Sequence, residues 1–156
     1  MTATTSSTST HRPIDPRGPR VAAGITAVVL AIAFITGAAW VLAVQVLAFL
    51  LASLFGVSRS PYGLIFQRFI RPRLDRPEEL EDPRPPRFAQ TVGLVVTGIG
   101  LVLAVLGVPY AVEGSAALAF LAAVLNAAFG LCLGCELYLL LARMRGVTIA
   151  RTVPAR

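Results

Sequence analysis

VAAGITAVVLAIAFITGAAWVLAVQVLAFLLASLFGV, residues 21–57, is a long apolar run without a single charged side chain. One helix over this run would extend about 55 Å, whereas the hydrocarbon core of a bilayer is about 30 Å thick. The run therefore predicts two membrane helices, 21–36 and 38–57, joined by a tight turn at Thr36-Gly37. Both are short for a span, which favours a closely packed helical hairpin.

The remainder of the chain also contains long apolar runs and few charged residues. The 156 residues are 56% hydrophobic and 14% charged, against about 25% charged residues in soluble domains. A third apolar run, 89–108, ends before Pro109, and a fourth, 115–142, ends before Arg143. We read 115–142 as one continuous, tilted helix.

The predicted fold is therefore an all-α integral membrane protein with four transmembrane helices arranged as two helical hairpins. The four-helix membrane domain covers residues 14–143 and contains a polar, Pro- and Arg-rich loop, 58–88. Residues 1–13 are expected to form a disordered tail, and residues 144–156 a second tail.

Arginines set the expected topology, and all 14 basic residues are arginine. They lie before the first span, in the loop 58–88 and after the last span, and the two other turns hold none. By the positive-inside rule, both termini and the loop are expected on the cytoplasmic side of the membrane. Because membrane insertion accounts for the positive charge, we expect the lipid bilayer as a partner and no nucleic acid.

The loop 58–88 carries a helix signal of its own. Ser60-Pro61 is a typical helix start, and the apolar residues that follow fall on one helical face. This predicts a short amphipathic interfacial helix. The acidic stretch 78–82 and the arginines after it form either a self-paired loop or a docking surface for a soluble partner.

A short repeat precedes the first and third spans. Asp15-Pro-Arg-Gly-Pro-Arg20 corresponds to Asp82-Pro-Arg-Pro-Pro-Arg87. The pair suggests two parallel hairpin repeats related by an axis along the membrane normal. The motifs are interpreted either as helix-entry signals or as sites where arginines bind an anion or an acidic partner; the arginines concerned are Arg17, Arg20, Arg84 and Arg87.

Two amides lie within the apolar runs. Gln45 and Asn126 fall at mid-membrane depth in the second and fourth spans. Such residues are expected to form hydrogen bonds between helices, because unpaired polar groups are costly in hydrocarbon.

Cys132-Leu-Gly-Cys135-Glu136 holds both cysteines of the chain. On a continuous helix the three reactive side chains share one face, and Cys135 lies about 12 Å below the cytoplasmic boundary. An ionisable residue at this depth is a functional candidate by default. A helix N-terminus, which would favour a thiolate, is not expected here unless the neighbouring glycines break the helix.

Three interpretations of Cys132, Cys135 and Glu136 remain open. The first is thiol chemistry, through a reversible disulfide or a persulfide, with Glu136 as proton carrier. The second is a metal site. Two thiolates and a carboxylate are too few ligands for a closed zinc site, although a dimer could pool them, and we name no metal ligands. The third is structural, with the cysteines packed as small apolar residues and Glu136 in an ion pair.

Several of these stretches resemble one family of small bacterial membrane proteins. They are Asp15–Arg20, Ser60-Pro-Tyr-Gly63, Glu79–Gln90, and Asn126 leading into Gly130–Glu136. The family is known only as domain of unknown function 4395, and the resemblance covers residues 14–143. It implies a four-span membrane protein without an assigned activity. Its members are often encoded near thioredoxin-like and rhodanese-like proteins, which favours thiol or sulfur handling.

The leading prediction is a membrane-embedded dithiol protein. It would exchange electrons or sulfane sulfur with a thioredoxin-like or rhodanese-like partner that docks on residues 58–88. One alternative is a small transporter or channel component for a sulfur-containing or other anionic solute, formed by a homodimer. Another is a structural membrane subunit without chemistry. The sequence has no nucleotide-binding loop, and we predict no cofactor.

Overall fold

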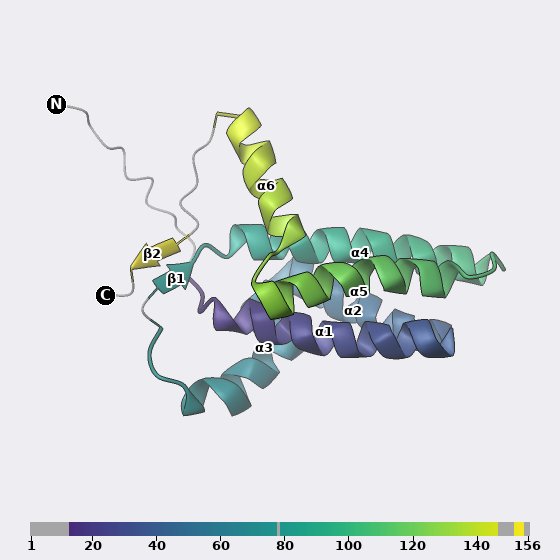
Figure 1. Cartoon of the computed structure of the whole chain (residues 1–156), viewed down its shortest axis with the longest axis horizontal. Coiled ribbons are helices and arrows are strands. Elements are labelled where there is room, and N and C mark those ends of the chain that lie inside the picture. Colours follow the sequence, from purple (N-terminus) through teal and green to yellow (C-terminus); the bar gives the residue numbers. More distant parts are fainter. Residues whose placement is uncertain (1–12, 78, 147–151, 155–156) are drawn as a thin grey trace.

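The computed structural model describes residues 13–77, 79–146 and 152–154, and within these the fold is all-α with six α-helices. Four long helices lie side by side along the molecule's long axis (Figure 1). They are α1 (Arg17–Thr36), α2 (Ala39–Phe55), α4 (Arg84–Val105) and α5 (Ala111–Phe129). The expected tail 1–13 lies almost entirely outside the described residues.

The first hairpin follows the prediction closely. Helix α1 ends at Thr36, and Gly37 adopts a left-handed conformation with φ 60°, which allows its N–H to bond Ala33 O. The chain then turns back directly into α2. A left-handed residue just after a helix is the usual role of glycine, so the turn at Thr36-Gly37 is confirmed.

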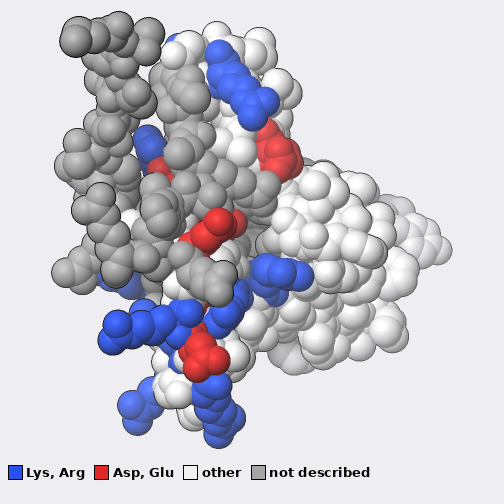
Figure 2. All heavy atoms as spheres, turned by 60° about the vertical axis from the view of Figure 1, so that its left-hand side comes forward, with Lys and Arg blue, Asp and Glu red and all other residues white. Residues whose placement is uncertain are grey.

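Three helices, α1, α4 and α5, are long and apolar enough to cross a membrane, and α2 is a shorter apolar helix of 17 residues. The chain is thus a multi-pass membrane protein. Figure 2 shows charged side chains gathered at one end of the molecule, while the visible surface of the bundle beyond them is uncharged. This distribution is what a bilayer around the bundle requires.

The fourth apolar run departs from the prediction of one helix over 115–142. Helix α5 ends at Phe129, and α6 (Leu133–Met144) is a separate helix that leaves the bundle at a steep angle (Figure 1). Gly130 causes the break: its φ is 68°, its N–H bonds Asn126 O, and the N–H of Leu131 bonds Leu125 O. The Gly130 bond is the one that closes an αL helix end, and this local signal outweighs the apolar continuity of the sequence.

The first helix of each hairpin packs on the second helix of the other hairpin. Helix α1 packs on α5, and α4 packs on α2, so the two contacts are equivalent if the hairpins are repeats. The repeated motifs also have matching geometry. Asp15 Oδ1 accepts the Arg17 N–H at 2.9 Å, and Asp82 Oδ1 accepts the Arg84 N–H at the same distance. The repeat therefore acts as a helix-entry signal in both copies.

A small antiparallel sheet lies at the charged end of the bundle. Strand β1 (Glu79–Glu81) pairs with β2 (Thr152–Pro154), and Ile14 forms a bridge to Glu81 through two backbone hydrogen bonds of 2.9 and 2.8 Å. Neither strand was predicted from the sequence, because three residues are too few for an alternating pattern to be recognised.

The central loop forms a chain of short helices: η1 (Val57–Arg59), α3 (Pro61–Ile65), η2 (Phe66–Ile70) and η3 (Arg71–Arg73). The predicted start is confirmed, since Ser60 Oγ accepts the Gly63 N–H at 3.1 Å. Phe66 is buried against Gly18 of α1, where an added Cβ would lie 3.3 Å from the ring. Ile65 and Phe69 stay exposed, as an interfacial helix requires.

Candidate functional site

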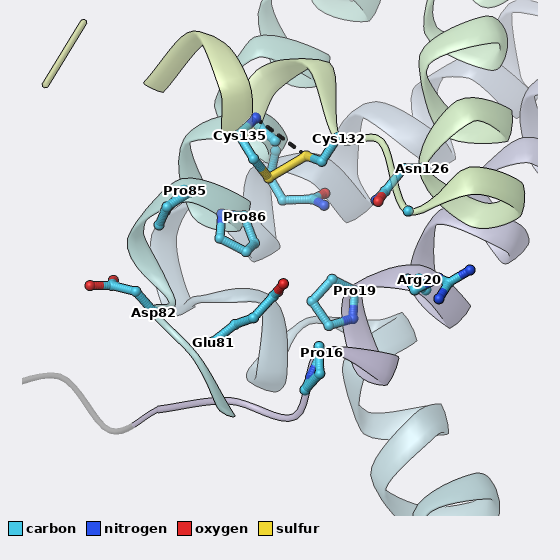
Figure 3. Close-up of a pocket in the computed structure, with 13 residues that line it drawn as sticks. Pro16, Pro19, Arg20, Glu81, Asp82, Pro85, Pro86, Asn126, Cys132 and Cys135 are labelled. Carbon is cyan, nitrogen blue, oxygen red and sulfur yellow. Dashed lines mark hydrogen bonds between the residues drawn. A yellow bond between two sulfur atoms is a disulfide. The ribbon is translucent and has the colours of Figure 1, made fainter. Parts of the chain in front are cut away.

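Both cysteines lie at the break between α5 and α6. Cys132 is the N-cap residue of α6, Cys135 is in its first turn, and the two are joined by a disulfide with their Cα atoms 5.1 Å apart (Figure 3). Both are buried, with 8% and 6% of their surface exposed. The Cys135 N–H donates to Cys132 Sγ at 3.3 Å.

This placement corrects the expectation that no helix N-terminus lies near the thiols. The expectation rested on a continuous helix, which Gly130 ends. A sulfur at the N-cap faces the unsatisfied N–H groups and the positive end of the helix dipole. Both stabilise a thiolate, so the geometry favours negative charge on Cys132 when the disulfide is reduced.

A pocket of about 180 Å³ lies in front of the disulfide. Its walls come from both repeated motifs, from α5 and from the α5–α6 break, so segments far apart in the sequence line the same pocket as the two cysteines (Figure 3). The first motif contributes Pro16, Pro19 and Arg20, and the second contributes Asp82, Pro85 and Pro86. The depth of Cys135 in the membrane stays a prediction, and charged residues lie in the wall of the pocket beside it.

The carboxylate in this pocket is not the predicted one. Glu136 is exposed and is not among the residues that line the pocket. Glu81 of β1 lines it instead, and its carboxylate is directed toward the disulfide side, whereas Asp82 points away (Figure 3). The signal that could have identified Glu81 is its position directly before the second motif, which the structure brings to the site.

The four nominated arginines all contact groups within the chain. Arg20 lines the pocket and donates weakly to Ala128 O at 3.5 Å. Arg87 donates to Ser53 O and Leu54 O at 2.6 and 2.9 Å, at the C-terminal end of α2. Arg84 forms an ion pair with Asp82 at 2.6 Å, and Arg17 donates to Asp75 O at 3.1 Å. Binding of an anion or an acidic partner by these arginines stays a prediction.

The two amides have different surroundings. Gln45 is fully buried, and its Oε1 accepts the Tyr62 hydroxyl at 2.9 Å, so its partner comes from the central loop. Burial raises the pKa of Tyr62 above its ordinary value, which keeps the phenol protonated as a donor. Asn126 lines the disulfide pocket near the end of α5.

Tyr62→Phe will lower the free energy of unfolding by about 1–3 kcal/mol, because a buried amide oxygen loses its donor. Thermal unfolding in detergent measures the loss. Tyr110→Phe is the control, since Tyr110 is 81% exposed and should leave the melting temperature unchanged. Equal melting temperatures for the two variants would show that the Tyr62–Gln45 bond contributes nothing.

A second cavity, of about 230 Å³, lies beside the first and is mainly apolar. Small side chains of α1, α4 and α5 leave the space open, and Phe49 of α2 closes one side. Both cavities share Ala89, Gln90, Asn126 and Cys132 in their walls. Cys132 thus borders a pocket with charged residues and an apolar cavity at once. Gln90 was not nominated from the sequence.

Among the described residues, no group of three or more His, Cys, Asp or Glu side chains is placed to hold a metal ion. The polar groups in the wall of the pocket are the cysteine pair, the carboxylates of Glu81 and Asp82, the guanidinium of Arg20, and the amides of Gln90 and Asn126.

The fold and the site define a class: a small multi-pass helical membrane protein with a closely spaced cysteine pair at the charged end of its bundle. The chain belongs to the family described as "Domain of unknown function (DUF4395)", whose model matches residues 14–143, as the sequence motifs indicated. No curated protein and no solved structure matches the chain.

Proposed function

We propose that this protein is a membrane thiol–disulfide exchange protein that accepts electrons from a cytoplasmic thioredoxin-like partner. In this proposal α2 is a fourth membrane span, and both termini and the central loop face the cytoplasm of a bacterial cell. The observation that carries it is the disulfide at a helix N-terminus, on the wall of a pocket lined by charged residues.

The exchange proceeds in two steps. A thiolate of the reduced partner attacks Cys132 Sγ; a mixed disulfide forms, and Cys135 leaves as a thiolate that takes up a proton. The partner's second thiolate then attacks its own sulfur in the mixed disulfide and releases Cys132 as a thiolate. The partner leaves oxidised, and two electrons remain on Cys132 and Cys135. Stabilisation of the Cys132 thiolate by the α6 N-terminus favours this last release.

The partner is expected to dock at the charged end of the bundle. The rim of the pocket there holds the two proline-rich motifs and strand β1. These segments carry side chains of both charges, which suits a transient, polar interface.

Incubating the oxidised protein with a reduced thioredoxin-like protein, in the absence of oxygen, tests the proposal. A mass-shifting maleimide then counts the thiols. Two new thiols per chain, formed in step with oxidation of the donor, are expected. A disulfide that survives a large excess of the donor would contradict the proposal, and both the transporter and the structural alternatives predict that result.

Glu81→Gln will slow exchange by about a hundredfold at neutral pH, because the pocket loses the group that passes a proton to the leaving Cys135. The pH dependence of the exchange rate separates this role from a structural one, since a proton carrier alters the profile as well as the rate. Glu79→Gln, on the same strand but exposed, is the matched control and should behave as wild type. Equal pH profiles for all three proteins would remove Glu81 from the mechanism.

A further inference from the structure

The second cavity has no role in exchange with a soluble partner. We propose that it binds a membrane quinone, which takes the two electrons from Cys132 and Cys135 and restores the disulfide. This inference rests on the proposed function, since it supplies the step that returns the protein to its oxidised form.

The lining of the cavity suits a quinone. Most of its wall is formed by alanine, valine, leucine and phenylalanine side chains, which accommodate an apolar ring, and two amides, Gln90 and Asn126, lie where it meets the disulfide pocket. Amide N–H groups are donors for carbonyl oxygens, and a quinone carries two such oxygens on a flat apolar ring. An acyl chain of a lipid would use the apolar wall but not the amides.

Access to the cavity is from the membrane side. Leu118 and Leu133 line it and are also 66% and 48% exposed, so the cavity reaches the outer surface of the helices. Helix α5 is one of the three long apolar helices, and its outer surface faces lipid in a membrane. A lipid-soluble electron carrier can therefore enter without crossing the charged end of the bundle.

Cys132 connects the two cavities chemically. It lines the pocket where the partner is expected and the cavity proposed for the quinone, so electrons need not move through the protein between distant groups. In the reaction the two thiols lose two protons and two electrons, and the S–S bond forms. The quinone oxygens take up both protons and both electrons, and the quinol leaves into the membrane.

Filling the cavity tests the inference. Ala122 and Ala119 line it, and neither lines the disulfide pocket, so Ala122→Leu and Ala119→Leu place extra carbons only in the proposed quinone site. Ala128→Leu on the same helix is the control, because Ala128 is exposed and lines neither cavity. The fully reduced protein is mixed with decylubiquinone without oxygen, and quinol formation and loss of thiols are followed together.

We expect saturable quinol formation with one disulfide formed per quinol, unchanged in Ala128→Leu. Both filling variants should lower the rate about tenfold or more, while exchange with the soluble donor stays at the wild-type rate. Two results would overturn the quinone site and leave the proposed function standing. One is quinone reduction that is as fast in the filled variants as in wild type. The other is wild-type protein that exchanges with the soluble donor but does not reduce the quinone. Loss of exchange in wild type would instead overturn the proposed function.

Discussion

Serine in place of Cys132 will abolish thiol–disulfide exchange with a soluble donor, lowering its rate by about a thousandfold or more. The reason is that the variant retains no sulfur at the α6 N-cap, where the partner's thiolate is proposed to attack and where the released thiolate is stabilised. The exchange rate in detergent, measured with the same donor for all variants, checks this.

Cys135→Ser will fail in a different way. It retains Cys132, whose thiolate can still attack the disulfide of an oxidised partner in the reverse of the proposed exchange. Cys135, which in that direction attacks Cys132 Sγ and releases the partner, is missing. We expect Cys135→Ser to accumulate a mixed disulfide with the partner, visible as a shifted band without reducing agent, and Cys132→Ser to accumulate none. Equal trapping by both variants, or trapping only through Cys135, would contradict the assignment of Cys132 as the reacting sulfur.

Gly134→Ala will destabilise the packing of α6 on α4 by about 3 kcal/mol, near the upper end of the usual cost of overpacking. A Cβ at this glycine would lie 2.6 Å from both the Cα and the Cβ of Ala89, and neither helix backbone can move aside cheaply. Because Ala89 also lines both cavities, we expect the variant to lose exchange activity together with stability. Thermal unfolding and the exchange assay measure the two effects.

Gly98→Ala is the matched control for Gly134→Ala. A Cβ at Gly98 meets nothing within 4 Å, so the added methyl group should leave exchange unchanged and raise helix stability slightly. The contact between α6 and α4 also includes the rings of Phe88 and Tyr138, with centroids 5.5 Å apart. Wild-type stability in Gly134→Ala would show that α6 does not pack on α4 as described.

The first hairpin could be predicted because its signals are local. An apolar run too long for one span, with a glycine at its middle, leaves few alternatives, and Gly37 adopts the left-handed turn that this requires. The start of α3 at Ser60-Pro61 was predictable for the same reason, since a capping side chain needs only its own neighbours.

The end of the fourth apolar run was not predictable with the same rules. Gly130 lies in an apolar stretch, and glycines are common inside membrane helices, so hydropathy alone favoured one span over 115–142. The structure ends α5 there because Gly130 is left-handed and Leu131 bonds Leu125 O. This single difference turns the cysteine pair from an intrahelical pair into a pair at a helix N-terminus.

The cysteines could be nominated from the sequence because no other thiols exist in the chain, and the structure joins them in a disulfide. The residues around them were harder to predict. Glu81 and the two proline-rich motifs reach the disulfide only through the packing of four helices and the Ile14–Glu81 bridge, which involve contacts between distant parts of the sequence. Sequence proximity suggested Glu136, and the structure places it on the exposed side of α6.

A redox titration of the Cys132–Cys135 pair tests the central claim most directly. The purified protein is equilibrated in detergent with glutathione buffers of graded potential, and a mass-shifting maleimide traps the thiols. The account predicts that both cysteines interconvert together between dithiol and disulfide, as a two-electron couple, within the range of potentials that cytosolic thiols span. Thiols that stay reduced and unreactive at every potential until the protein is denatured would contradict it and identify both cysteines as packing residues.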